Sequence, residues 1–381
     1  MDSIFIAAGE NSGEKYGASL IRQFKKIHPS YSFFGIGGKQ MAAQGVELLH
    51  SVEDLGVVGG FEVIAHLPRL KKIFDRVRRE VRHRKPLASV LIDSPDFNLR
   101  LAKKLKKMSI PVLYYVSPTV WAWRKKRMKT IKKTVKKMML IFPFEEKIYA
   151  QAGIQAAYVG HPLLEKIGIS LSRQEFFEKY GLNPDKKLIA VLPGSRKSEL
   201  KYHMEVLTEA LHRLQKEQDA QFVLLLAESL DRDLLSVHLP FLPGQLRVLV
   251  EDHYEAISSS DLVLSSCGTA NLEAALLETP LIAFYRISPI SYSLGRWLVK
   301  INDFSIVNIL AGKRIIPELI QNGFTAENII KEANRIFDSD EARTKMIGHF
   351  KMIKKILGEK IASQNAALEL QKLISGNVSI L

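Results

Sequence analysis

The chain has 381 residues, of which 46% are hydrophobic, so it is long enough for two or three domains and too apolar to be disordered throughout. The single cysteine, Cys267, excludes an internal disulfide, and no Cys/His spacing is typical of a zinc site. The first residues lack the pattern of a signal peptide, and the uncharged run 108–123 is too short, and too interrupted by proline, to span a membrane. We therefore expect a cytoplasmic protein.

Short β-branched runs alternate with helical patterns along the first part of the chain. Strands separated by helices indicate βαβ units and a parallel sheet. The expected strands are 3–8, 31–36, 88–92, 112–116, 138–142 and 157–160, and the expected helices are 14–28, 61–84, 99–108 and 124–137.

The same alternation resumes after a polar stretch near 168–172. Two such series predict an α/β protein with two Rossmann-like, doubly wound parallel-sheet domains at 1–165 and 166–344, and a ligand cleft between them. The C-terminal helices, about 345–381, are expected to pack back on the first domain or to exchange between subunits, and a homodimer is left open. The expected strands are 187–192, 222–227, 247–250, 262–265 and 281–285. The expected helices include 198–217 and 271–278, and the segment 341–374 is expected to be helical, with few helix-breaking residues.

The net charge of +15 resides in the first predicted domain. Residues 1–165 contain 29 basic and 14 acidic residues, whereas the remainder contains 26 of each. No acidic residue lies between Asp96 and Glu145, where there are 14 basic ones. Such a segment is typical of a solvated surface, of nucleic-acid binding, or of binding to an anionic membrane. The lack of a nucleic-acid-binding motif and the apolar stripes beside the basic residues favour the membrane over nucleic acid.

Two loops that follow strands of the first domain carry polar residues. The first, 9–14, has glycines spaced by four, which matches neither a dinucleotide-binding fingerprint nor a Walker A motif. It is either a substrate-binding turn or a plain strand-to-helix turn capped by Ser12. The second, 93–98, places two carboxylates at a strand end, where one can have a raised pKa and act as a general base. The alternative is that Asp96 only caps the next helix.

Two loops of the second domain lead through a glycine into a helix. In 192–196, the helix N-terminus and Arg196 are suited to a phosphate, although Arg196 could instead pair with Glu199 on the surface. In 265–273, a second helix N-terminus could hold another phosphate, and Glu273 could bind ribose hydroxyls or only complement the helix dipole. Cys267 is interpreted as a packing residue, because no base accompanies it.

Taken in order, the motifs of this chain resemble those of the lipid-A-disaccharide synthases, bacterial glycosyltransferases of the two-Rossmann-domain (GT-B) architecture. The resemblance extends from the first strand to about residue 336. It is carried by AGENSGE (8–14), IDSPDFN (92–98), YVSPTVWAWRKKR (115–127), LPGSR (192–196), SCGTANLE (266–273) and NILAGKR (308–314).

The resemblance implies inverting transfer from UDP-2,3-diacylglucosamine to 2,3-diacylglucosamine 1-phosphate, with release of UDP and without a metal or another cofactor. It implies that Asp96 is the catalytic base and that Arg196 and Glu10 act with it. Glu14 stands where the family usually has Asp. The residues expected to bind the nucleotide sugar are Gly194, Ser195, Arg196, Gly268, Thr269, Glu273 and Asn308.

An apolar segment, 55–70, and two tryptophans of the first domain are expected to contact the acyl chains or the membrane. Burial in the core is the alternative. With the basic surface, they predict an enzyme held peripherally at the anionic surface of the inner membrane. The residues chosen for this contact are Val58, Phe61, Ile64, Leu67, Trp121 and Trp123.

Two other functions stay open at this point. One is a different UDP-sugar reaction, such as 2-epimerisation of UDP-N-acetylglucosamine, which would not need a basic, apolar face. The other is a non-catalytic module that binds a membrane or nucleic acid. A steep salt dependence of RNA binding without any response to UDP would favour that module.

Overall fold

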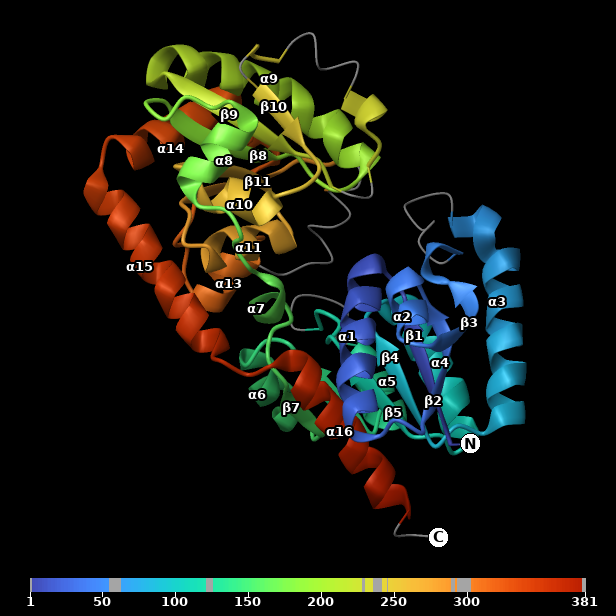
Figure 1. The fold of residues 1–381 in the computed structure, drawn as a ribbon. Helices are drawn as coiled ribbons and strands as arrows, with labels where there is room; N and C mark the ends of the chain where they lie inside the picture. The colour runs from blue at the N-terminus through green and yellow to red at the C-terminus, as the bar shows by residue number, and fades with distance from the viewer. Residues whose placement is uncertain are drawn as a thin grey trace. The chain divides into compact units, whose positions relative to one another are not determined.

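The computed structural model describes residues 2–54, 63–120, 126–227, 230–235, 242–244, 246–288, 292 and 303–378. The chain divides into two compact units (Figure 1). Unit 1 consists of Met1–Glu165 and Leu357–Leu381, and unit 2 of Lys166–Ile356. The chain leaves unit 2 after Ile356, later than the expected 344.

The described part of unit 1 contains a seven-stranded parallel sheet in the order β3-β2-β1-β4-β5-β6-β7. Its strands are β1 (Ser3–Ala8), β2 (Ser32–Gly37), β3 (Val46–Ser51), β4 (Ala88–Ile92), β5 (Val112–Tyr115), β6 (Lys137–Leu140) and β7 (Ala156–Tyr158). Its helices are α1 (Asn11–Ile27), α2 (Lys39–Ala43), α3 (Val63–Arg84), α4 (Pro95–Lys107), α5 (Lys126–Thr134), α6 (Phe144–Gln151) and α7 (Leu163–Lys166), the last of which reaches the boundary with unit 2.

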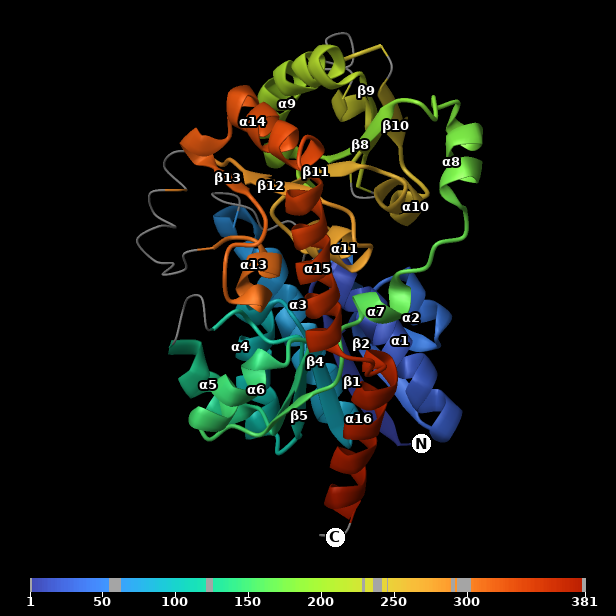
Figure 2. The same ribbon diagram turned by 90° about the vertical axis from the view of Figure 1, so that its left-hand side faces the viewer.

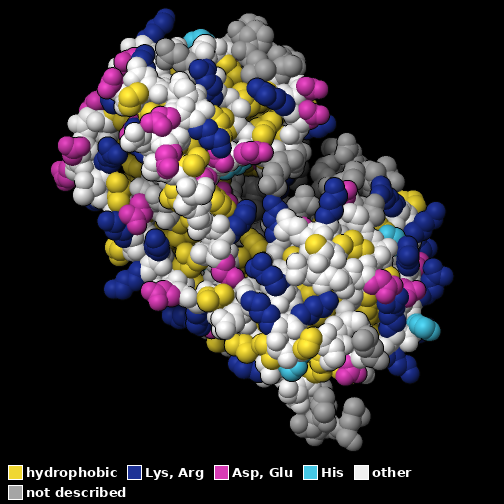
Figure 3. Space-filling model, in the orientation of Figure 1, with side chains coloured by type: hydrophobic (Ala, Val, Ile, Leu, Met, Phe, Trp, Pro, Cys, Tyr) yellow, Lys and Arg dark blue, Asp and Glu magenta, His cyan; other side chains and the backbone are white. Residues whose placement is uncertain are grey.

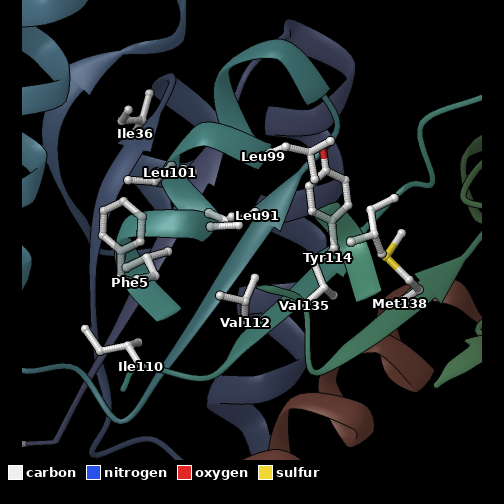
Figure 4. Packing of buried hydrophobic residues seen from close by; sticks show 14 of the residues in the cluster. Phe5, Ile36, Leu91, Leu99, Leu101, Ile110, Val112, Tyr114, Val135 and Met138 are labelled. Carbon is white, nitrogen blue, oxygen red and sulfur yellow. The ribbon is translucent and has the colours of Figure 1, made fainter. Parts of the chain in front are cut away.

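The central strands of unit 1, β1, β4, β5 and β6, are buried on both faces, which is why they are nearly continuous apolar runs in the sequence. Successive side chains point to opposite faces, so Phe5 enters one hydrophobic layer and Ile6 the other. Helices α3, α4 and α5 cover the first layer, and α1 and the C-terminal helix cover the second. Figure 4 shows part of the first layer, in which Phe5, Leu91 and Tyr114 from the strands lie together with Leu101 of α4.

The described part of unit 2 contains a six-stranded parallel sheet in the order β10-β9-β8-β11-β12-β13. Its strands are β8 (Lys187–Leu192), β9 (Ala220–Leu225), β10 (Leu246–Leu249), β11 (Leu262–Ser266), β12 (Leu281–Tyr285) and β13 (Glu318–Ile320). Its helices include α8 (Arg173–Tyr180), α9 (Lys197–Gln218), α10 (His253–Ser258), α11 (Thr269–Leu276), α13 (Ile306–Ala311), α14 (Ala326–Phe337) and α15 (Asp340–Leu357), which ends at the boundary with unit 1.

The C-terminal segment, which was expected to be helical, consists of two helices. Helix α15 ends at Leu357, and Gly358 follows with a φ of 64°, a left-handed conformation that terminates helices. Helix α16 (Ala362–Val378) then lies alongside α1 on unit 1, as Figures 1 and 2 both show. Its buried Ala366 and Leu370 belong to the same hydrophobic layer as α1. None of the helices in the described ranges is long and apolar enough to span a bilayer.

Several short elements were not among those expected from the sequence, including β3, α2, α6 and β13. Strands β3 and β13 each form the edge of a sheet, and β13 has only three residues. Such elements depend on pairing with a neighbour more than on their own periodicity, so a local pattern does not reveal them.

Candidate functional site

In each sheet, the order of the strands changes direction between two neighbouring strands. A candidate loop follows each of these two strands. In unit 1 the neighbours β1 and β4 form this switch point, and in unit 2 the neighbours β8 and β11 do. Ligands of doubly wound sheets bind beyond the carboxyl ends of such strands. The four loops singled out in the sequence, 9–14, 93–98, 192–196 and 265–273, are the loops that follow these four strands.

The two loops of unit 1 approach each other closely. A Cβ atom on Gly9 would lie 1.9 Å from the Cβ of Ser94, so only glycine allows this contact. Asp93 and Ser94 have φ values of 51° and 43°, both left-handed. Two side chains hold this strained turn through the carbonyl oxygen of Asp93. The Tyr114 hydroxyl donates to it at 2.7 Å, and the Asn98 amide donates to it at 2.8 Å.

Asp93 is the electrostatically unusual carboxylate of this site. Burial, and secondarily the nearby charge of Glu10, raise the pKa of Asp93 from its ordinary 3.8 to about 6. Glu10 is exposed at the N-terminus of α1, where it occupies the N-cap position. The loop after β1 and the loop after β4 therefore bring two carboxylates together, one of which titrates near neutral pH.

Asp96 has a different environment from Asp93. Its side chain is 70% exposed, and it forms an ion pair of 2.8 Å with Arg127. It lies in the first turn of α4, where Ser94 is the N-cap residue. The alternative interpretation of Asp96 as the helix cap is therefore wrong, because the helix begins earlier, at Pro95.

Glu14 is buried and has a structural role. Its Oε1 accepts hydrogen bonds from the backbone N–H groups of Gln40 at 2.6 Å and Met41 at 3.0 Å, at the start of α2. It thus satisfies amides that the first turn of a helix leaves without a partner. Ser12, considered as a cap for α1, lies inside that helix.

In unit 2, the turn after β8 is organised by a carboxylate. The side chain of Glu199 accepts hydrogen bonds from the Ser195 N–H at 2.8 Å, from the Arg196 guanidinium at 3.1 Å and from the Tyr285 hydroxyl at 3.3 Å. Gly194 has a φ of 130°, and a Cβ atom there would lie 2.5 Å from Glu199. The surface pairing considered for Arg196 is therefore present, although Glu199 itself is buried.

The turn after β8 already holds one anionic group of the protein itself. The carboxylate of Glu199 accepts hydrogen bonds from three donors there. The side chains of Ser195 and Arg196 are nevertheless exposed, at the N-terminus of α9. Sequence reasoning named Glu199 only as a surface partner and missed Tyr285. The spacing Arg-x-x-Glu at a helix start was the available signal for Glu199.

The turn after β11 leads into α11 with Gly268 as its N-cap residue, and Gly268 and Thr269 are exposed. Glu273, one turn into the helix, accepts a hydrogen bond from the Tyr254 hydroxyl at 3.4 Å. Burial raises the pKa of the Cys267 thiol well above its ordinary value. Cys267 is therefore a neutral thiol at neutral pH, in agreement with the packing role expected for it.

Asn308 does not have the solvent-facing position expected of a ligand-binding residue. It is fully buried in α13. Its amide donates to the Ile316 carbonyl at 3.1 Å and to the Glu318 carboxylate at 2.8 Å, and its oxygen accepts from the N–H groups of Ile315 and Ile316. Both N–H groups and both lone pairs of the amide are thus used within the protein. This geometry supports a structural role, which the motif alone could not distinguish from binding.

The residues chosen for acyl-chain or membrane contact are not open to comparison with the structure. Val58, Phe61, Trp121 and Trp123 lie outside the described residues. Ile64 and Leu67 belong to α3, but their side chains also lie outside the described set.

No metal centre was expected, but two Asp-x-Asp triplets, a pattern that can ligate a metal, occur at 231–233 and 338–340. Neither follows a strand at a switch point. Among the residues that the structure describes, no three His, Cys, Asp or Glu side chains come together as metal ligands.

Comparison with known protein families gives one result over nearly the whole chain. A family model described as lipid-A-disaccharide synthetase matches residues 4–371. The lipid-A-disaccharide synthase of Solibacter usitatus (strain Ellin6076) is 38% identical over 380 residues, which cover 100% of this chain and 99% of that protein. The enzyme of the same name from Myxococcus xanthus (strain DK1622) is 40% identical over 97% of each chain.

Solved structures share the fold at low sequence identity. The UDP-GlcNAc 2-epimerase of Neisseria meningitidis, bound to UDP-GlcNAc, has a TM-score of 0.66 and 12% identity, covering 98% of this chain and 100% of that chain. MurG from Acinetobacter baumannii has a TM-score of 0.59 and 14% identity, covering 97% and 99%. At these identities the likeness shows the fold alone. It confirms the predicted class of two parallel-sheet α/β domains.

Proposed function

The chain belongs to the lipid-A-disaccharide synthetase family and is a glycosyltransferase, and we propose that it joins UDP-2,3-diacylglucosamine to 2,3-diacylglucosamine 1-phosphate with release of UDP. The observation that carries this proposal is the family match over residues 4–371, which includes all four switch-point loops. The product is a β-1,6-linked disaccharide, so the anomeric centre is inverted in one displacement.

Inversion in one step requires a base that removes the proton of the acceptor hydroxyl. Two observations favour Asp93 over the predicted Asp96 for this role. Asp93 has a pKa of about 6, so it is ionised at pH 7 and still basic enough to accept a proton. Asp96 is exposed and paired with Arg127, which suits it to orient that arginine. We therefore assign the base to Asp93, with Glu10 as the charge that helps to raise its pKa.

UDP leaves with increasing negative charge on its diphosphate, and unit 2 offers groups that stabilise such charge without a metal. The exposed guanidinium of Arg196 and the N-terminus of α11 at Gly268 are suited to the phosphates. The Glu199 carboxylate already accepts from the Ser195 N–H and from one nitrogen of Arg196, so the exposed remainder of the Arg196 guanidinium is the part of this turn suited to a phosphate. Glu273, held by Tyr254, is suited to the ribose hydroxyls.

The charge distribution on unit 1 supports its association with an anionic membrane surface. Helices α3, α4 and α5, which cover one face of the sheet, contain 18 basic and three acidic residues. Helices α1, α2 and α16 contain six basic and two acidic residues. Figure 3 shows Lys and Arg outnumbering Asp and Glu on the visible surface of unit 1. Substrates that carry acyl chains reside in a bilayer, so a basic face would hold the enzyme at the membrane that contains its substrates.

The experiment that tests this function measures UDP release in detergent with EDTA, with either substrate alone and with both. We expect release by the wild type only when both substrates are present. Asp93→Asn should lower kcat by at least about 100-fold, because general-base catalysis contributes about 10²–10⁴. Asp96→Asn should keep most of the activity.

The possible outcomes separate the parts of the proposal. The opposite pattern of the two variants would return the base to Asp96. Release without the acceptor would favour a different UDP-sugar reaction. A folded wild type that releases no UDP would contradict the assigned substrates, and activity lost to EDTA would contradict a metal-independent reaction.

The predicted apolar contact has its own test. Replacing Val58 and Phe61 together by Glu should lower binding to liposomes without changing the thermal unfolding temperature, because both changes oppose insertion into an apolar layer. Unchanged liposome binding would remove these two residues from the membrane contact.

A further inference from the structure

His203 lies in the second turn of α9 and connects the ends of two strands of unit 2. The residue is fully buried. Its Nδ1 lies 2.6 Å from the carbonyl oxygen of Pro193, in the turn after β8. Its Nε2 lies 3.0 Å from the backbone nitrogen of Arg286, directly after β12. The imidazole therefore joins segments that are separated by more than 90 residues of sequence.

The protonation of this imidazole follows from its partners. Nε2 faces both the N–H of Arg286 at 3.0 Å and the carbonyl oxygen of Arg286 at 3.1 Å. In the neutral ring that accepts the Arg286 N–H at Nε2, the proton is on Nδ1, which donates to the Pro193 carbonyl. Burial, partly opposed by the Pro193 carbonyl and by the charge of Glu199, lowers the pKa of His203, which favours the neutral ring at pH 7. Edge-on contacts with Phe284 and Phe324 fix the orientation of the ring.

The attachment point after β12 is itself anchored. The guanidinium of Arg286 donates to the backbone carbonyl groups of Gln321 and Phe324, which precede α14. The Ile287 N–H donates to the side chain of Gln321 at 3.3 Å. His203 thus ties the turn after β8 to a segment that cannot shift without breaking several hydrogen bonds.

Glu199 precedes His203 by four residues, so both side chains lie on the same face of α9. Glu199 binds the Ser195 N–H, and His203 binds the Pro193 carbonyl. These two backbone groups flank Gly194, whose φ of 130° is accessible without strain only to glycine. The turn is therefore held from both sides by one helix.

We propose that His203 is a positioning residue for the nucleotide diphosphate: through its hydrogen bond to Pro193 it fixes the turn that presents Ser195 and Arg196. This inference rests on the proposed function, in which that turn binds the diphosphate of UDP. An apolar side chain would fill the same volume, but it would leave the Pro193 carbonyl and the Arg286 N–H without their partner. The turn would then lose one of its two attachments and the geometry that the phosphates require.

The test compares the affinities for UDP and for uridine by calorimetry, with the full chain. His203→Phe keeps an aromatic ring and removes both hydrogen bonds. It should weaken UDP binding about tenfold, equivalent to about 1.4 kcal/mol, and leave uridine binding unchanged, because uridine has no phosphate. His203→Asn places an amide N–H near the position of Nδ1 and should recover most of the UDP affinity. His203→Gln reaches the Nε2 position instead and should recover less.

Leu207→Ala is the matched control, since Leu207 is fully buried one turn further along α9. It should lower the unfolding temperature without changing the ratio of UDP to uridine affinity. If the wild type prefers UDP but His203→Phe and His203→Asn keep the wild-type ratio, the positioning role is wrong while the proposed function stands. If the wild type itself binds UDP no more tightly than uridine, the diphosphate role of the turn is wrong, and the inference fails with it.

Discussion

Asp93 and Asp96 are three residues apart in the sequence, yet their surroundings give them different chemistry. The pKa of Asp93 is raised from 3.8 to about 6, so between these pH values the unfolded chain loses a proton that the folded chain keeps. The free energy of unfolding should therefore fall as pH rises from about 4 to about 6, by up to about 3 kcal/mol for a shift of roughly two units. Asp93→Asn should remove this dependence.

Urea denaturation at pH 4 and pH 7 measures the effect of Asp93. The exposed Asp96 supplies the control, and Asp96→Asn should retain the wild-type difference between the two pH values. Activity should follow the same group: kcat/KM of the wild type should rise with pH through about 6 as Asp93 ionises. An unchanged difference in Asp93→Asn would show that another group is responsible.

Gly160 is a backbone position at which the C-terminal segment packs closely against the rest of unit 1. Its φ is 112°, and a Cβ atom there would lie 2.2 Å from the carbonyl oxygen of Lys360. Gly160→Ala should therefore destabilise the protein by about 2 kcal/mol or more in chemical denaturation. Gly168→Ala is the matched control, because no atom lies within 4 Å of its Cβ position, and it should change stability by less than about 0.5 kcal/mol. Equal effects would contradict the steric argument.

Helix α16 completes the hydrophobic layer that α1 covers on unit 1. Leu370 is fully buried in this layer. Leu370→Ala should cost about 2–5 kcal/mol of unfolding free energy, from lost apolar burial and the cavity left behind. Met352 on α15 is 58% exposed, and Met352→Ala should cost less than about 0.5 kcal/mol. A small effect at Leu370 would mean that α16 contributes little to unit 1.

At the scale of the whole molecule, the excess of basic over acidic residues belongs to unit 1, where helices α3, α4 and α5 on one face of the sheet carry it. A uniformly solvated surface would not show this asymmetry. Charge reversal on the basic face should therefore weaken membrane binding more than the same charge reversal on the opposite face. Lys103→Glu with Lys107→Glu, on α4, should weaken binding to vesicles containing anionic lipid by more than about tenfold, since each basic residue near such a surface contributes about 1 kcal/mol.

The control for this charge reversal has the same change in net charge on the opposite face. Arg22→Glu with Lys26→Glu, on α1, alters two exposed basic residues and should change vesicle binding by less than about threefold. Co-sedimentation at two salt concentrations measures both, and binding of the wild type should fall at higher salt. Equal losses in the two double variants would mean that net charge alone drives association.

Much of the architecture can be predicted from the sequence. Strands buried on both faces are continuous apolar runs, so β1, β4, β8 and β12 begin and end at the residues expected. Since ligands of parallel sheets bind beyond the carboxyl ends of strands, the four loops of interest also followed from the sequence. These features depend on periodicity and turn residues within about ten positions of one another.

The roles of individual side chains depend on neighbours that are remote in the chain. Asp93 acquires its raised pKa from burial beside Glu10, and His203 acquires its function from Pro193 and Arg286. Asn308 resembles a binding residue in its motif, yet its amide is used internally. Burial, charge and hydrogen bonding act through space, so these properties arise only when folding brings distant strand ends together. The order of strands and loops depends on the local pattern of residues, so the sequence by itself determines it.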